Sequence, residues 1–233
     1  MSIIIEACCG SVAEAWAAVQ GKADRIELCA ALPTGGVTPT TGMLLAAKER
    51  CSLPVVSMVR PKEGGPVIDE AEFSACLKDV TALVRAGSEE VITGFLNPDF
   101  TLDKPKCRAL IEAAEGAPVA LHRVFDMAPD LDCALEEAIE LGFCRILTSG
   151  GAPDVDQGFD TLKRLVQRAG DKITLLAGGG VRLHNAKRLV EEGGLKEIHF
   201  SFRRKTHVLG YQGDPDTLPD PQRLLDVRDS LAF

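Results

Sequence analysis

The feature that most restricts the fold of this sequence is an alternation, repeated eight times, of short β-rich runs with longer amphipathic stretches. The short runs are rich in β-branched residues, and the longer stretches place apolar residues at a period near 3.6. The predicted strands are Ile3–Cys8, Arg25–Cys29, Pro54–Arg60, Glu90–Gly94, Pro118–His122, Arg145–Ser149, Ile173–Ala177 and Glu197–Ser201. The predicted helices are Ser11–Gln20, Gly42–Arg50, Asp69–Ala86, Lys104–Glu115, Asp130–Leu141, Gln157–Ala169, Leu183–Glu191 and Pro221–Asp229.

Eight βα units in one chain predict an α/β protein with a parallel sheet, and eight strands close into a barrel. We therefore predict a (β/α)8 TIM barrel in which residues 1–233 form a single domain. An open doubly wound sheet is the alternative. The length of 233 residues and the 45% of hydrophobic residues suffice for one large core. Glycines that end every second helix favour the closed barrel, and they are Gly21, Gly87, Gly142 and Gly194.

Charge and cysteine usage exclude several classes of function. The 26 Lys and Arg against 34 Asp and Glu give a net charge of −8, which argues against a nucleic-acid partner. The N-terminus has no basic and apolar leader, and no apolar run reaches the length of a membrane helix, so we expect a cytoplasmic protein without a membrane partner. The eight Cys contain no C-x-x-C pair, which argues against zinc ribbons and thioredoxin chemistry.

The strand pleat predicts which side chains point into the barrel, because facing alternates along each strand. Apolar neighbours such as Ile26 and Leu28 face the helices, so the residues between them face inward. The inward residues near the C-terminal mouth are Glu6, Glu27, Arg60, His122, His199 and Ser201. Acids, imidazoles and a guanidinium at one mouth are typical of acid/base chemistry or anion binding. The alternative is an ion-pair network in which Arg60 bridges Glu6 and Glu27.

The segment that follows the fifth predicted strand adds two candidates. His122 is placed to act as a general acid or base near neutral pH. Asp126 is placed to orient an imidazole or to bind a cation, and its alternative role is to cap a helix or turn. Arg123 is placed to pair with an acid outside the barrel.

Glycine-rich joints after the sixth and seventh strands predict anion binding, because backbone N–H groups approach an anion closely there. The candidate residues are Ser149, Gly150, Gly178, Gly179 and Gly180. The alternative is tight turns that need a positive φ. The sequence contains neither a Walker motif nor a dinucleotide-binding fingerprint, so no organic cofactor is indicated.

Cys8 and Cys29 each lie two residues beyond a strand-end glutamate on neighbouring strands. Neighbouring strands are about 4.8 Å apart, so two thiolates there could share a soft ion such as copper(I). The alternative is that both are small core residues.

Several segments together resemble the CutC family, which has been linked to copper homeostasis. They span residues 3 to about 203 and comprise Glu6–Cys8, Ala23–Cys29, Gly35–Pro39, Met58–Pro61, His122–Asp126, Leu147–Ala152 and Gly178–Val181. The resemblance implies a TIM barrel that is a homo-oligomer in the cytosol. It also implies a copper(I) site, which maps onto Cys8 and Cys29.

The sequence departs from the family pattern at three places. Cys9-Gly10 replaces the usual Val-Asp after the first cysteine, which removes an acid and adds a thiol. The motif that begins at Arg60 has an insertion and one arginine fewer. Phe200 and Phe202 stand where the family has small residues, and these bulky rings argue against a standard phosphate site beside the glycine loop.

Two functions follow from the sequence, and a third alternative is a barrel that serves mainly for assembly. The first is copper(I) binding and copper homeostasis. The second is an enzyme that acts on a small anionic or phosphorylated molecule, with Glu27 or His122 moving the proton and Arg60 holding the anion. The segment Arg203–Pro219 is predicted to be a loop with a solvated basic start, and the alternative is that this start forms a lid over an acidic mouth.

Overall fold

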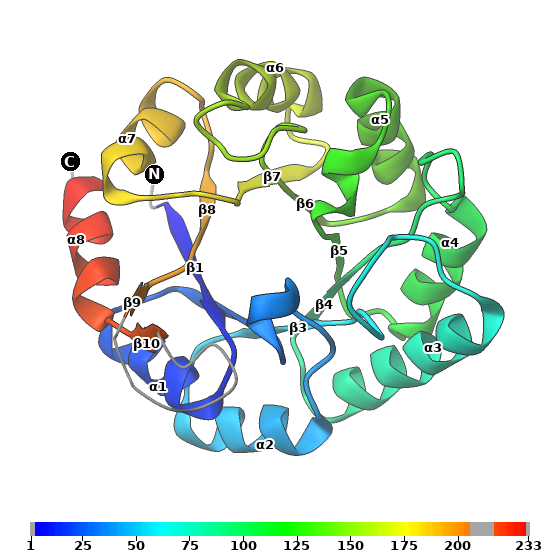
Figure 1. Cartoon of the computed structure of the whole chain (residues 1–233), viewed down its shortest axis with the longest axis horizontal. Coiled ribbons are helices and arrows are strands. Elements are labelled where there is room, and N and C mark those ends of the chain that lie inside the picture. The colour runs from blue at the N-terminus through cyan, green and yellow to red at the C-terminus, as the bar shows by residue number, and fades with distance from the viewer. Residues whose placement is uncertain (1–2, 206–216, 232–233) are drawn as a thin grey trace.

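The computed structural model describes residues 3–205 and 217–231, and it contains a closed barrel of eight parallel strands (Figure 1). The strands are β1 Ile4–Cys9, β2 Arg25–Leu28, β3 Val55–Met58, β4 Glu90–Thr93, β5 Val119–Leu121, β6 Arg145–Thr148, β7 Thr174–Ala177 and β8 Glu197–Phe200. They pair in chain order, and β8 pairs with β1 to close the ring. The prediction of a TIM barrel is confirmed, and the open sheet is excluded.

The helices form the outer layer of the barrel (Figure 1). They are α1 Val12–Gln20, α2 Thr41–Arg50, α3 Glu70–Arg85, α4 Lys104–Ala113, α5 Leu131–Leu141, α6 Phe159–Ala169, α7 Leu183–Glu191 and α8 Pro221–Leu231. Five of them begin directly after a Ser, Thr or Asp whose side chain accepts a bond from a backbone N–H of the first turn. None of the described helices is both long and apolar enough to span a membrane.

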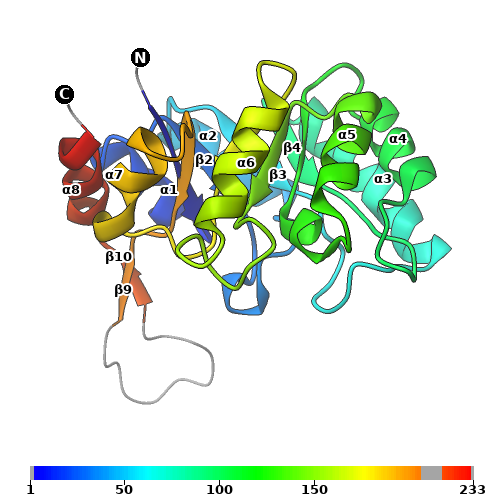
Figure 2. The same ribbon diagram turned by 90° about the horizontal axis from the view of Figure 1, so that it is seen from above.

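The prediction of a loop over Arg203–Pro219 is wrong at both of its ends. β9 Arg203–Lys205 and β10 Thr217–Pro219 form an antiparallel two-stranded ribbon that projects from the barrel (Figure 2). Arg203 is not solvated, because its guanidinium forms an ion pair with Glu14 at 2.8 Å and donates to the Cys8 carbonyl at 3.1 Å. These contacts hold the start of the segment extended against the barrel. Residues 206–216 of the predicted loop lie outside the described residues.

Side chains alternate between two cores along each strand. Ile26 and Leu28 face the helices and are fully buried in the outer core, whereas Glu27 and Cys29 face the barrel axis. The apolar part of the inner core comes mainly from β3 to β7 and consists of Cys29, Val56, Met58, Ile92, Ala120, Leu147 and Leu176. The β8–β1–β2 side of the barrel carries ionisable groups instead, so the functional side of the barrel is set by these three strands.

Below the mouth, buried ion pairs connect the two sides of the barrel. Arg25 pairs with Glu6 at 2.6 Å and with Glu197 at 2.5 Å. Arg145 pairs with Glu197 at 2.9 Å and also with Glu90. Because a buried charge costs several kcal/mol unless it is paired, these arginines fix the carboxylates around them. The partner of Glu6 is therefore Arg25. The alternative network, in which Arg60 bridges Glu6 and Glu27, is wrong.

Candidate functional site at the mouth of the barrel

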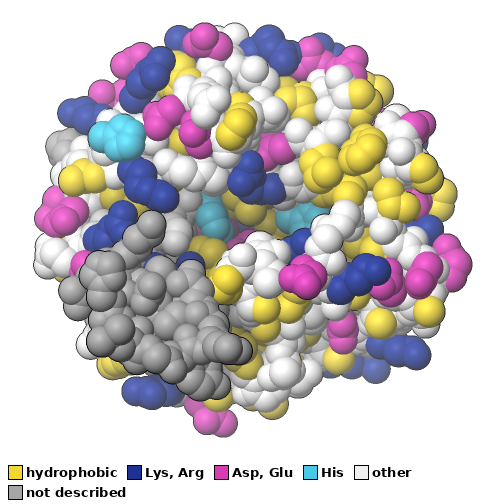
Figure 3. Space-filling view, viewed as in Figure 1, with side chains coloured by type: hydrophobic (Ala, Val, Ile, Leu, Met, Phe, Trp, Pro, Cys, Tyr) yellow, Lys and Arg dark blue, Asp and Glu magenta, His cyan; other side chains and the backbone are white. Residues whose placement is uncertain are grey.

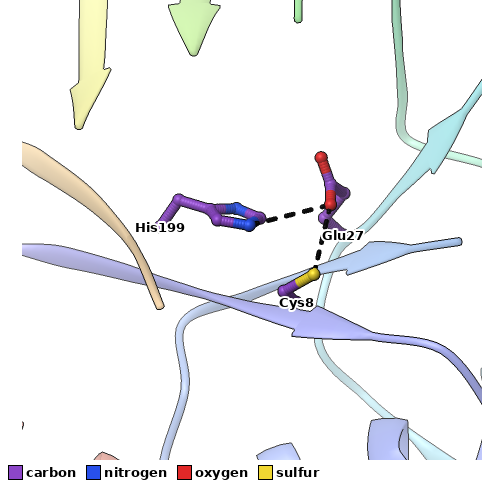
Figure 4. A group of neighbouring side chains, drawn as sticks. All are labelled: Cys8, Glu27 and His199. Atoms are coloured by element: carbon purple, nitrogen blue, oxygen red, sulfur yellow. Dashed lines mark hydrogen bonds and ion pairs between the residues drawn. The ribbon is translucent and has the colours of Figure 1, made fainter. Parts of the chain in front are cut away.

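Three neighbouring strands bring an acid, a thiol and an imidazole together at the mouth (Figure 4). The parallel register sets Cys8 beside Glu27 and Glu6 beside His199. The sulfur of Cys8 lies 3.6 Å from Glu27 Oε2, and His199 Nε2 lies 3.8 Å from the same oxygen. Cys8, Glu27 and His199 each offer one atom that can bind a metal ion, and these three atoms lie within 4.8 Å of one another. Sequence-distant residues therefore form one cluster.

Cys29 joins this cluster from the end of β2. Its sulfur lies 3.3 Å from Glu27 Oε2, so both thiols approach one carboxylate oxygen. The extra thiol of Cys9 takes no part, because its side chain faces the outer core and contacts the Ala7 carbonyl. The predicted pairing of Cys8 with Cys29 is thus geometrically available at the barrel mouth.

The two inward glutamates differ in ionisation: near neutral pH the Glu6 carboxyl is ionised, whereas the Glu27 carboxyl is mostly protonated. Burial favours the neutral form of Glu6, but the hydrogen bond with His199 and the charge of Arg25 outweigh it and lower the pKa to about 2. Burial raises the pKa of Glu27 to about 8, because no guanidinium contacts it among the described residues. Glu27 Oε1 is buried without a hydrogen-bond partner in the described structure. Because buried polar atoms are usually hydrogen-bonded, an unpaired oxygen on a residue that lines a cavity is a candidate partner for a ligand atom.

The imidazole and the thiols are also perturbed. Burial opposes protonation of His199, but the carboxylates of Glu27 and Glu6 and the Cys8 sulfur together raise its pKa well above the ordinary value. A hydrogen bond with Cys29 lowers the pKa of Cys8 against the effect of burial, and nearby His199 adds to the shift. The same hydrogen bond and burial raise the pKa of Cys29. The cluster therefore favours a Cys8 thiolate beside an imidazolium.

Above the cluster lies a cavity of about 410 Å³, whose floor includes Cys8, Glu27 and His199. Figure 3 shows histidine side chains inside a hollow at the centre of this face and Lys and Arg side chains at its edge. The basic side chains that line the cavity are Arg60, Lys62, Arg123, Arg182 and Arg203. A hollow of this size is in the range of small-molecule sites.

His122 and Arg60 line this cavity, but within the described structure neither forms a hydrogen bond or ion pair with the cluster of Cys8, Cys29, Glu27 and His199. His122 is buried, and burial and the charge of Arg60 lower its pKa to about 4, so it is a neutral imidazole. Its Nδ1 accepts a bond from the Val124 N–H at 3.3 Å. Arg60 donates to the backbone carbonyls of Gly36 and Gly64, at 2.9 and 3.1 Å. Its charge is available to the cavity, because no carboxylate pairs with it among the described residues.

Asp126 points away from the cavity. It lies on the 3-10 helix η2 Arg123–Met127, whose tight turn ends the strand alternation and directs the carboxylate toward the loop after β6. Asp126 accepts bonds from the N–H groups of Ser149 and Gly151, both at 3.0 Å, and from the Thr148 hydroxyl. It therefore holds that loop, and it contacts no imidazole among the described residues.

The predicted anion-binding residues separate into two groups. Gly179 and Gly180 line the cavity. Ser149, Gly150 and Gly178 do not, since the Ser149 hydroxyl bonds to Asp126 and the two glycines pack against neighbouring chain segments. Phe200 and Phe202 are buried in the outer core behind the site, so their rings do not narrow it.

Two residues that line the cavity were not among the predicted site residues. Arg123 was expected to pair with an acid outside the barrel; it pairs with Asp126 at 2.9 Å and also lines the cavity. Arg182 follows the triple glycine directly and also lines the cavity. A cation next to a glycine-rich joint at a strand end was a signal that could have identified Arg182.

The fold and the cluster define a (β/α)8 barrel with a thiol, carboxylate and imidazole site at its mouth. The model of the CutC family matches residues 3–204, and the chain belongs to that family. A CutC family protein of Treponema denticola is 37% identical over 214 residues, which cover 92% of this chain and 87% of the relative. One from Agrobacterium fabrum is 44% identical over 199 residues, or 85% and 79% of the two chains.

A solved structure supports the same assignment. The crystal structure of CutC from Streptococcus agalactiae, a protein provisionally assigned to copper homeostasis, aligns with a TM-score of 0.80 at 28% identity. The alignment covers 84% of this chain and 97% of that protein.

Proposed function

We propose that the mouth of the barrel binds copper(I) as a cargo through the thiols of Cys8 and Cys29, with His199 completing the ligand set. The observation that carries this proposal is the approach of both sulfurs to one carboxylate oxygen, at 3.6 and 3.3 Å, with the imidazole 3.8 Å from the same atom. A role in copper homeostasis follows, as assigned provisionally to the protein from Streptococcus agalactiae.

The residues present fit a soft ion. Thiolate sulfur and imidazole nitrogen are the ligands that copper(I) prefers, whereas magnesium and calcium prefer oxygen. Sulfur and nitrogen ligands bond to metal ions such as zinc at about 2.0–2.3 Å. The ligand atoms of Cys8 and His199 lie within 4.8 Å of each other and of Glu27, and the Cys29 sulfur lies 3.3 Å from Glu27 Oε2, so the side chains would have to close in around the ion. Glu27 Oε2 contacts both thiols, so this carboxyl group lies beside the ion that the thiols would hold.

Copper(I) titration of the reduced, metal-free protein tests the proposal. We expect one equivalent to bind tightly, with a rise in Tm, because an ion that binds only the folded state stabilises it. Loading of several equivalents with similar affinity would contradict the proposal, since it would indicate unselective reaction with the protein's thiols. We also propose that the protein acts in the cytoplasm as a homo-oligomer, as the family resemblance implies.

A second function is favoured by a separate observation, the unpaired and buried Glu27 Oε1 at the floor of a cavity far larger than a metal ion. We infer an enzyme that acts on a small anionic molecule. Glu27 transfers the proton, Arg60 draws the anion, and neutral His122 offers a hydrogen bond from the opposite wall. In a screen of small phosphorylated and carboxylated compounds, we expect conversion by the wild type and none by Glu27→Gln. Equal conversion by both proteins would refute the role of Glu27.

A further inference from the structure

Copper binding at the floor leaves the upper cavity unexplained. The cavity wall carries five basic side chains, and two of them, Arg60 and Arg182, have no carboxylate partner among the described residues. Uncompensated guanidinium charge around a hollow attracts an anion. The upper cavity is therefore suited to a ligand of opposite charge to copper.

The loop between β7 and α7 presents backbone donors to this cavity. Gly179 and Gly180 have φ values of 92° and 87°, and with Val181 they line the cavity. None of the three N–H groups donates to an acceptor in the described part of the chain. Successive N–H groups in such a conformation form a concave site for an anion.

Arg123 lies against the same loop. A Cβ atom on Gly179 would lie 2.7 Å from both Cζ and Nη1 of Arg123, so only glycine lets the guanidinium lie this close. Arg123 Nε donates to Asp126 Oδ2 at 2.9 Å, and Nη2 donates to the Ser149 hydroxyl at 2.6 Å. Nη1 has no acceptor among the described residues and remains available beside the loop.

We propose that Arg123, Arg182 and the N–H groups of residues 179–181 form a subsite for the phosphate group of a small phosphomonoester. The proposal rests on the second proposed function and assigns its substrate class. Glu27 supplies the independent observation, because it lines the same cavity and its Oε1 is buried without a hydrogen-bond partner in the described structure, which marks the side of the cavity where the reacting part of that ligand would bind. Asp126 is a positioning residue that holds Arg123 through the 2.9 Å ion pair.

Binding of inorganic phosphate to the metal-free protein, measured by calorimetry, tests the subsite. We expect saturable binding that Arg182→Ala and Arg123→Ala each weaken about tenfold or more, since each removes a charge-assisted hydrogen bond. Arg168→Ala is the matched control, because Arg168 pairs with Glu136 on the outer face and lies away from the cavity. Sulfate should compete and acetate should not. Wild-type protein that binds no phosphate, or cavity variants that bind it as the control does, would overturn the proposal.

The role of Asp126 has its own test. We expect Asp126→Asn to weaken phosphate binding in the wild type but to have no added effect in Arg123→Ala, because the two residues act through one contact. Equal effects in both backgrounds would leave Asp126 as a purely structural residue and refute the positioning role. Glu27→Gln should bind phosphate as the wild type does. Phosphate binding with unaltered turnover in Glu27→Gln would reject the proposed catalysis while retaining the subsite.

Discussion

Replacing Cys8 and Cys29 together by serine is expected to abolish tight copper(I) binding. Serine keeps a hydrogen bond to Glu27 but offers a hard oxygen where the ion needs soft sulfur. Loss of an outer contact to a metal ligand costs roughly 10- to 100-fold in affinity, and losing two direct ligands should cost more. Competition with a chromogenic copper(I) chelator under anaerobic, reducing conditions measures the effect.

Cys9→Ala is the matched control for this substitution. Cys9 is the next residue along β1, is equally buried, and faces the outer core rather than the mouth. We expect the control to lose some stability and to keep its copper affinity. If the double variant holds copper within about threefold of the wild type, or if Cys9→Ala loses as much affinity, the thiol assignment fails.

Glu27→Gln is expected to stabilise the metal-free protein by about 3 kcal/mol at pH 7. Burial raises the pKa of Glu27 from 4.5 to about 8, so the folded protein retains a proton that the unfolded chain releases. The wild type therefore loses stability as the pH rises from 4.5 to 8, at about 1.4 kcal/mol per pH unit. Glutamine does not titrate, so the advantage of the variant should vanish near pH 4.5 and level off above pH 8.

Glu6→Gln is the control of opposite sign. The pKa of Glu6 is lowered to about 2, so its charge contributes stability above pH 4.5 that is lost as the pH falls toward 2. Removing that charge leaves Arg25 without one of its two carboxylates, and we expect a loss of about 3 kcal/mol at pH 7. Urea unfolding across the pH range measures both variants. A Glu27→Gln protein that is less stable than the wild type at pH 7 would contradict this assignment.

The opposite signs of the stability changes expected for Glu27→Gln and Glu6→Gln bear on the functions of these two residues. A residue retained although its isosteric replacement stabilises the fold is typical of a functional site, where stability is given up for activity. If the predicted gain in stability is found, Glu27 is such a residue, whereas Glu6 holds His199 at 2.8 Å and Arg25 at 2.6 Å. The two acids lie on neighbouring strands, and we predict different roles for them.

Much of the barrel and of the site could be predicted, because both depend on the alternation of inward and outward side chains along each strand. The alternation of Ile26 and Leu28 with Glu27 and Cys29 gave the inward direction correctly, since the outer core accepts only the apolar pair. The same rule placed His199 at the mouth. The closure of the barrel followed from the count of βα units.

The predictions that the structure corrects concern residues beyond the ends of the strands, where the inward–outward alternation of side chains no longer applies. Asp126 follows β5 on a 3-10 turn, so its direction does not obey the strand alternation. Arg60 lies two residues beyond Met58, the last residue of β3. It lines the cavity and bonds to loop carbonyls, so only the alternative in which it bridges the two acids is wrong. The choice of Arg25 as the partner of Glu6 depends on strand register, which pairs these two positions across β1 and β2. A single sequence gives no such register.

X-ray absorption at the copper edge of the loaded protein tests the copper site most directly. With one equivalent of copper(I) bound, we predict a first shell that contains two sulfur scatterers, from Cys8 and Cys29, and one nitrogen from His199. Because combining Cys8→Ser with Cys29→Ser should abolish tight binding, any copper that remains on that double variant should show no sulfur contribution. A first shell of nitrogen and oxygen alone, or one that still contains sulfur in that double variant, would place the ion elsewhere and contradict a copper site at the mouth of the barrel.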